Sequence, residues 1–168
     1  MTASRSPALE LDIQLAPDTP ELPAGADFPA WIRASLSAAA RERGALAVDG
    51  AVSLRLVGLE EGASLNATWR HKQGATNVLA FPGPRPGSAP PAGMLLEYGD
   101  LVICLPVVLR EAAEQDKAPR NHLAHLVVHG TLHLLGYTHD DETDTARMEA
   151  LETGILAGLG IADPYVSK

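Results

Sequence analysis

The stretch 129–139, His-Gly-Thr-Leu-His-Leu-Leu-Gly-Tyr-Thr-His, constrains this chain more than any other. His129 and His133 are four residues apart, and on an α-helix that spacing places both imidazoles on one face, one turn apart. Gly136 follows where such a helix would end in a left-handed turn, so the chain can fold back and bring His139 toward the other two. Three neutral imidazoles with an open fourth position are typical of catalytic zinc. We therefore expect one Zn²⁺ per chain, bound by His129, His133 and His139.

The spacing H-x3-H-x2-G-x2-H is similar to that of the metzincin metallopeptidases, with one departure. In those peptidases the residue after the first histidine is the glutamate that acts as general base, and here it is Gly130. The pattern therefore indicates a metal site but opposes a peptidase. His122 and His125 lie upstream on the same expected helix face, where packing or hydrogen bonding is favoured over metal ligation.

The length and composition favour a single cytoplasmic domain. A chain of 168 residues is about the size of one domain and can bury a core. Because the chain has a single cysteine, Cys104, it cannot form an intrachain disulfide, which favours a reducing compartment. Cys104 lies in an apolar run and is expected to be a buried packing residue. The N-terminus lacks the apolar segment of a signal peptide, and no apolar stretch approaches the length of a membrane span. We therefore expect no membrane partner.

The charge distribution limits what kind of nucleic acid the chain could bind. A net charge of −8 argues against a uniformly basic surface of the kind that binds duplex nucleic acid, and no DNA partner is expected. The sign is not uniform, because six basic residues against five acids lie between Arg70 and Arg120. Any nucleic-acid surface should be local and drawn from this middle region.

Hydrophobic periodicity predicts about four strands and five helices. Strands are expected at 9–15, 51–57, 77–81 and 95–105, the last of which Gly99 and Asp100 could interrupt, and helices at about 29–43, 61–70, 106–117, 119–135 and 143–159. Asp27 should cap the first helix, and Leu65 and Trp69 should form the apolar side of the second.

The mixture of elements, with helices gathered in the second half, predicts an α+β fold. We expect one small mixed β-sheet covered by helices, with a metal-bearing helix like that of the metallopeptidases. Residues 1–168 should form a single domain, with a loose tail at 1–8 and a proline-rich loop at 82–93.

Beyond the histidine motif, several blocks resemble YbeY-type endoribonucleases, the bacterial rRNA maturation factors. They are Leu65-Asn66, Arg70, Thr-Asn-Val-Leu-Ala-Phe-Pro at 76–82, Gly-Asp-Leu-Val-Ile-Cys at 99–104, Met-Glu-Ala-Leu-Glu at 148–152 and Leu-Gly-Ile-Ala-Asp-Pro-Tyr at 159–165. These blocks cover most of residues 60–165 in the family's order. One departure is Thr138, which stands where the family usually has an aspartate. That aspartate could form a hydrogen bond that orients a metal ligand. Asp140 or Asp141 could take over that support.

The expected metal and one arginine would supply the chemistry of phosphodiester hydrolysis. A divalent ion on three imidazoles makes hydroxide available near neutral pH and polarises a phosphoryl oxygen. The charged transition state also needs a positive group, and the resemblance places Arg70 at the family's functional cleft. A surface salt bridge is the alternative role for Arg70.

Asn66 and Asn77 could contact substrate or make turn hydrogen bonds, and Asp100 could pack against the site or hold a turn. The acids at 140–144 should cap the last helix.

The resemblance implies a zinc-dependent endoribonuclease specific for single-stranded RNA. It implies action in rRNA maturation, including the 3′ end of 16S rRNA, and in ribosome quality control. The implied partners are single-stranded rRNA, the small ribosomal subunit and its assembly proteins. Two alternatives stay open at this point: a ribosome-assembly binding factor whose metal is mainly structural, and a metallopeptidase, which Gly130 opposes.

Overall fold

The computed structural model describes residues 8–44, 49–83 and 96–165, and within them it confirms the α+β fold with one mixed sheet. The expected tail at 1–8 and loop at 82–93 lie mostly outside the described residues. The elements are β1 (Leu9–Leu15), α1 (Phe28–Glu42), β2 (Gly50–Val57), α2 (Leu59–Arg70), β3 (Val78–Pro82), β4 (Leu96–Cys104), α3 (Leu105–Glu114), α4 (Pro119–Leu134) and α5 (Glu142–Gly158). No helix of this described part is long and apolar enough to cross a membrane.

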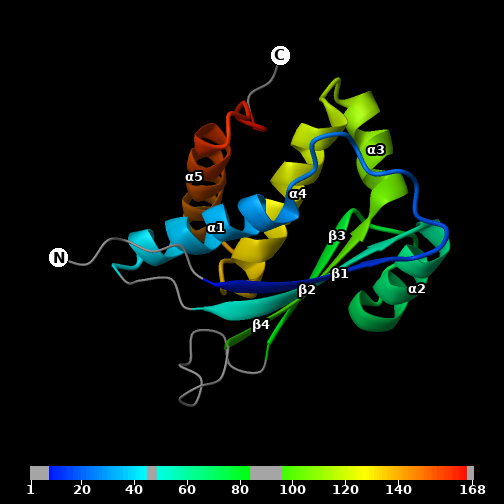
Figure 1. The fold of residues 1–168 in the computed structure, drawn as a ribbon, viewed down its shortest axis with the longest axis horizontal. Helices are drawn as coiled ribbons and strands as arrows, with labels where there is room; N and C mark the ends of the chain where they lie inside the picture. The colour runs from blue at the N-terminus through cyan, green and yellow to red at the C-terminus, as the bar shows by residue number, and fades with distance from the viewer. Residues whose placement is uncertain (1–7, 45–48, 84–95, 166–168) are drawn as a thin grey trace.

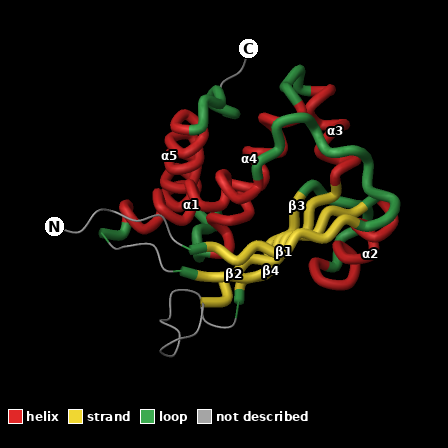
Figure 2. Tube along the Cα trace, viewed as in Figure 1, coloured by secondary structure: helices red, strands yellow, loops and turns green. Residues whose placement is uncertain are grey.

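The four strands form one sheet in the order β1-β2-β4-β3. The pairs β1–β2 and β2–β4 are parallel, whereas β3 runs antiparallel to β4 at the edge of the sheet. Helices α1, α3, α4 and α5 lie on one side of the sheet and α2 lies on the other (Figures 1 and 2). The register shifts between Ala51 and Val52, where Tyr98 is the extra residue of a bulge, so β4 continues through Gly99 and Asp100 without a break.

The core has two parts, one on each face of the sheet, because strand side chains alternate between the faces. Leu101 and Ile103 of β4 pack into the larger cluster with the helices, whereas Val102 and Cys104 pack into the smaller one beside α2. Cys104 is therefore a buried packing residue, as its apolar surroundings in the sequence predicted.

The helix ends follow the predicted signals. The carboxylate of Asp27 accepts a hydrogen bond from the backbone N–H of Ala30 at 3.2 Å, which caps α1. Pro119 opens α4, where its missing N–H has no cost. Gly136 follows α4 with φ +94°, a conformation that allows the chain to turn back toward the helix.

The prediction for Trp69 was wrong. Leu65 is half-buried against the smaller core cluster, but Trp69 is 61% exposed. The buried residues of α2 are Gly62 and Asn66. Trp69 lies in the last turn of the helix at the edge of the sheet, where the ring of Phe81 on β3 is its aromatic neighbour.

Candidate metal centre

The structure brings the three predicted histidines together at the end of α4. Each of His129, His133 and His139 offers a ring nitrogen, and these nitrogens all lie within 4.8 Å of one another. The ring centroids are 4.5 Å apart for His129 and His133, and 5.0 Å apart for His133 and His139. The left-handed turn at Gly136 is what returns His139 to the helix. The arrangement matches the one expected from the spacing, and metal binding itself stays a prediction.

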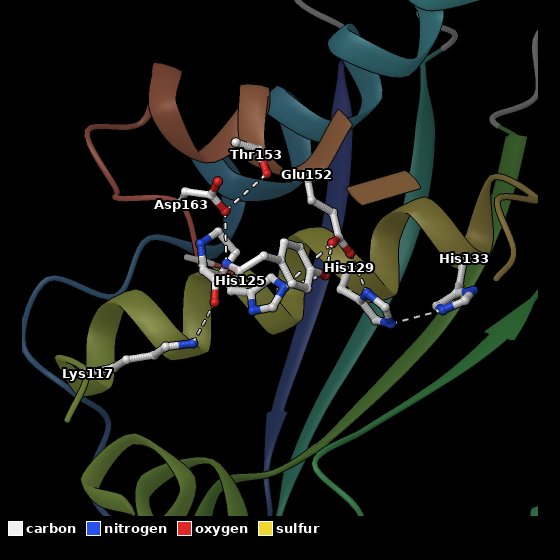
Figure 3. Close-up of polar contacts among 9 residues, drawn as sticks. Lys117, His125, His129, His133, Glu152, Thr153 and Asp163 are labelled. Atoms are coloured by element: carbon white, nitrogen blue, oxygen red, sulfur yellow. Dashed lines mark hydrogen bonds and ion pairs between the residues drawn. The ribbon is translucent and has the colours of Figure 1, made fainter. Parts of the chain in front are cut away.

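A buried carboxylate holds His129 in place. Glu152 has no exposed surface and extends from α5 toward His129, whose Nδ1–H donates a hydrogen bond to it (Figure 3). The hydroxyl of Tyr165 donates to the other carboxylate oxygen, and Nε2 of His125 lies 3.6 Å from that oxygen. Burial alone would raise the pKa of Glu152, but the contacts with His125, His129 and Tyr165 together outweigh burial and lower the pKa to about 2. The carboxylate is therefore ionised at neutral pH.

A backbone carbonyl holds His133. Its Nδ1–H donates to the carbonyl oxygen of Tyr137 at 2.9 Å. Burial, with a smaller contribution from His129, lowers the pKa of His133 to about 4, so its imidazole is neutral at pH 7. The guanidinium groups of Arg43 and Arg147 lie over the ring of Tyr137, at 4.5 and 5.2 Å from its centroid. Contacts with α1 and α5 therefore fix the carbonyl that orients His133.

These hydrogen bonds leave the Nε2 atoms of His129 and His133 facing each other. Nδ1 of each ring is already used, and the two Nε2 atoms lie 3.0 Å apart, within hydrogen-bond distance. A cation that binds both nitrogens would take the place of the proton between them. Tetrahedral zinc with Zn–N bonds of about 2.0–2.1 Å would separate its nitrogen ligands by about 3.3 Å. His139 is exposed and can add a third nitrogen from the solvent side. The residues therefore fit a divalent metal held by three imidazoles.

The three histidines share a cleft with Arg70. The cleft has a volume of ≈ 610 Å³, and Lys72 and residues 76–80 and 82 also line it. One N–H of the Arg70 guanidinium donates to the carbonyl of Ala80 at 2.6 Å, and the group lies 5.4 Å from the centroid of Phe81. Within the described residues no ion pair involves Arg70, so the alternative of a surface salt bridge gains no support there. The fold thus brings Arg70 to the histidines from another part of the chain.

Other polar residues singled out in the sequence make structural hydrogen bonds. The buried amide of Asn66 donates to the carbonyl of Gly74 at 2.8 Å, which is one of its two predicted roles. Asn77 donates to Glu111 at 3.0 Å and accepts from the backbone next to it. Asp100 lines a groove with Leu65 and Trp69 on the α2 side of the sheet, so it does not pack against the histidines.

The acids after His139 act as predicted, at the start of α5. The carboxylate of Asp141 accepts a hydrogen bond from the backbone N–H of Asp144 at 2.7 Å and caps the helix. The hydroxyl of Thr138 donates to the carboxylate of Asp144 at 3.3 Å. Upstream, Nε2 of His122 bonds to Glu111 at 2.9 Å, which agrees with the hydrogen-bonding role favoured for it.

Sequence reasoning missed Glu152 as part of the site. Its signals are its place in the block at 148–152 that resembles the family, and a charge at a position of the buried stripe of α5, between Met148 and Ile155. A charge there requires a partner from another element. The periodicity of α5 cannot identify that partner as His129.

The family model described as Endoribonuclease YbeY matches residues 18–160. The chain belongs to the YbeY family. The resemblance inferred from the sequence blocks is therefore confirmed.

Curated relatives in the YbeY family are similar over nearly the whole chain. The protein called Endoribonuclease YbeY of Pseudomonas syringae pv. tomato is 50% identical over 157 residues, which are 94% of this chain and 88% of that protein. The Endoribonuclease YbeY of Xanthomonas oryzae pv. oryzae is 46% identical over 162 residues, or 95% and 96% of the two chains. The solution structure of TM1509 from Thermotoga maritima shares the fold, with a TM-score of 0.54 and 21% identity over 93% of this chain and 99% of that chain.

Gly130 separates this YbeY-family site from that of the metallopeptidases. A Cβ atom at position 130 would lie 2.9 Å from Cδ2 of Leu101 and 3.2 Å from Cγ2 of Val78. Helix α4 therefore lies directly on β3 and β4, and any side chain at this position would require Leu101 and Val78 to shift. The peptidase alternative lacks its general base, and the packing of α4 disfavours a glutamate there.

Proposed function

We propose that this YbeY-family protein is a zinc-dependent endoribonuclease that cleaves single-stranded RNA. It acts in the cytoplasm on rRNA, including the 3′ end of 16S rRNA, and in ribosome quality control, with the small ribosomal subunit and its assembly proteins as partners. The observation that carries the proposal is the meeting of three imidazoles and Arg70 on one cleft. Relatives named Endoribonuclease YbeY at 45–50% identity support the reaction class.

The side chains of the cleft have distinct tasks in this proposal. A bound Zn²⁺ would activate water and polarise a phosphoryl oxygen. Glu152 and the carbonyl of Tyr137 keep His129 and His133 in the tautomer that binds metal. Arg70 binds the phosphate, because its bond to Ala80 uses one of five guanidinium N–H donors and leaves the others available.

The charge around the cleft suits one unpaired strand. Arg70, His71 and Lys72 are consecutive and exposed at the end of α2, and Arg70 and Lys72 line the cleft. Duplex binding requires many phosphate contacts over a broad surface, which a chain with a net charge of −8 does not favour. A local basic strip can follow the backbone of a single strand.

Metal content and RNA cleavage test the proposal together. Wild-type protein should contain one zinc per chain, and His133→Ala should lose it. Arg70→Ala should keep its zinc and melting temperature but cleave a labelled single-stranded RNA on the order of 10²-fold more slowly in single turnover, comparable to the loss of one transition-state donor. Arg70→Lys should restore part of the rate, because an ammonium cannot make a two-pronged contact.

Each arm of this experiment has a result that contradicts it. Equal metal content in wild type and His133→Ala would remove the three-histidine site. Wild-type cleavage by Arg70→Ala would remove Arg70 from catalysis. Normal rRNA processing in cells that carry only a folded His133→Ala protein would favour the assembly-factor alternative.

A further inference from the structure

The exposed Trp69 forms an aromatic pair with Phe81. The chain has two tryptophans, and Trp31 is 1% exposed in the core while Trp69 is 61% exposed. The rings of Trp69 and Phe81 meet edge to face, with centroids 6.1 Å apart. This contact holds the indole in position but leaves most of its surface in water. A large aromatic surface fixed in this way can accept a stacked ligand.

The pair lies at the edge of the sheet, next to the histidine cleft. Trp69 and Phe81 line a groove of ≈ 500 Å³ on the α2 side of the sheet. Ala80 and Pro82, the neighbours of Phe81 on β3, line the histidine cleft. Since β3 is an edge strand, only that strand lies between the groove and the histidine cleft.

Arg70 lies between the groove on the α2 side and the histidine cleft. It lines the cleft, and its guanidinium also lies over the ring of Phe81 at 5.4 Å. Trp69, Phe81 and Arg70 therefore form a continuous series of flat groups around the edge of the sheet. A strand whose phosphate is bound by Arg70 has its neighbouring nucleotide within reach of Trp69.

The charges of the groove select which part of a nucleotide enters it. Glu61, Asp100 and Arg55 line it, and Arg55 is paired with Glu61 through a 2.8 Å hydrogen bond, so the acids outnumber the basic residue. The groove is therefore a poor place for a phosphate and a suitable one for an uncharged base. The phosphates belong instead along the basic residues that follow Trp69 in the sequence.

We propose that Trp69 is a stacking platform for an unpaired RNA base next to the phosphate bound in the histidine cleft. The inference rests on the proposed RNA substrate and adds a subsite to it. An unpaired base can stack on the indole without the free-energy cost of breaking a base pair, so the subsite helps to select single-stranded RNA. Stacking tolerates every base, and removing such an aromatic weakens binding about 5- to 150-fold.

Tryptophan fluorescence and RNA affinity test the subsite. A short fluorescein-labelled oligoadenylate is titrated on ice into the protein as purified, and a gel confirms that the RNA stays intact. Stacking on Trp69 should quench its emission, and Trp69→Phe, which leaves only the buried Trp31, should show no quenching. Trp69→Ala should bind at least about fivefold more weakly, and Trp69→Phe should stay close to wild type in affinity.

A matched control and cleavage kinetics complete the test. Leu59→Ala removes another exposed apolar side chain, 51% exposed in the first turn of the same helix, and should bind RNA as wild type does. Trp69→Ala should raise KM about tenfold with little change in kcat or zinc content. If wild type cleaves RNA and Trp69→Ala matches it in KM and affinity, the subsite is overturned and the proposed function stands. If wild type neither binds nor cleaves RNA, both are overturned.

Discussion

Among the residues around the candidate metal centre, Glu152 is the one that contacts a proposed ligand from the buried side. Its carboxylate is fully buried, and that position is stable because two imidazoles and the hydroxyl of Tyr165 surround it. Its charge favours the proton of His129 on Nδ1, so that Nε2 is the nitrogen that faces the candidate metal position. The proposed role is one of positioning, because Glu152 would act on a bound metal only through His129.

Replacing the carboxylate by an amide tests this role. Glu152→Gln keeps the shape, but the amide can donate to Nδ1 of His129 and move the imidazole proton to Nε2. Zinc affinity should fall about 10- to 100-fold, the usual effect of losing a group that orients a metal ligand. Competition with a chelator measures the affinity, and the ¹⁵N shifts of the His129 ring report the tautomer. Glu142→Gln, in the exposed first turn of the same helix, is the control. Unchanged affinity and an unchanged His129 tautomer in Glu152→Gln would contradict the positioning role.

At the scale of elements, local signals predicted most of the fold. The strand expected at 9–15 is β1 without change, and the helix expected at about 29–43 is α1 at Phe28–Glu42, because Asp27 fixes where it begins. Local signals also predicted that Gly136 would return His139 to the helix. They did not predict the exposure of Trp69 or the burial of Glu152. Both depend on which element covers a given helix turn, and the pattern within one helix does not contain that information.

The close approach of α4 to the sheet predicts opposite effects for one substitution in two helices. Gly154 lies inside α5 with open space where a Cβ would be, so Gly154→Ala should raise the free energy of unfolding by roughly 0.5–1 kcal/mol through helix propensity. Gly130→Ala gains the same propensity but places a methyl group 2.9 Å from Leu101, which is 1% exposed in a close-packed core. Overpacking typically costs about 1–3 kcal/mol, so Gly130→Ala should be destabilised overall.

Urea unfolding of the two glycine variants measures both effects under one set of conditions. An increase in stability for Gly130→Ala as large as that for Gly154→Ala would show that α4 can move away from the sheet. The steric argument against a glutamate at position 130 would then fail as well.

At the scale of the whole molecule, the candidate site depends on nearly every layer of the fold. Helix α4 carries two histidines, α5 supplies Glu152, and Arg43 at the end of α1 packs on Tyr137. On the other side of the cleft, α2 and β3 supply Arg70 and the edge of the sheet. The larger core cluster includes residues of α1, β2, β4, α3, α4 and α5. A site built in this way should lose its geometry only when the whole core opens.

The expectation of a single domain therefore predicts one cooperative unfolding transition. In Trp69→Phe, the fluorescence of Trp31 reports on the larger core and far-UV circular dichroism reports on all helices, including α2. The two urea transitions should coincide, as they do when no intermediate is populated. Zinc should move both transitions together, by about 2.7 kcal/mol at a free concentration of 100 times its Kd. His133→Ala is the control and should show no shift with zinc. Two separated transitions, or a zinc shift confined to one probe, would mean that the metal-bearing helices and the sheet unfold as separate units.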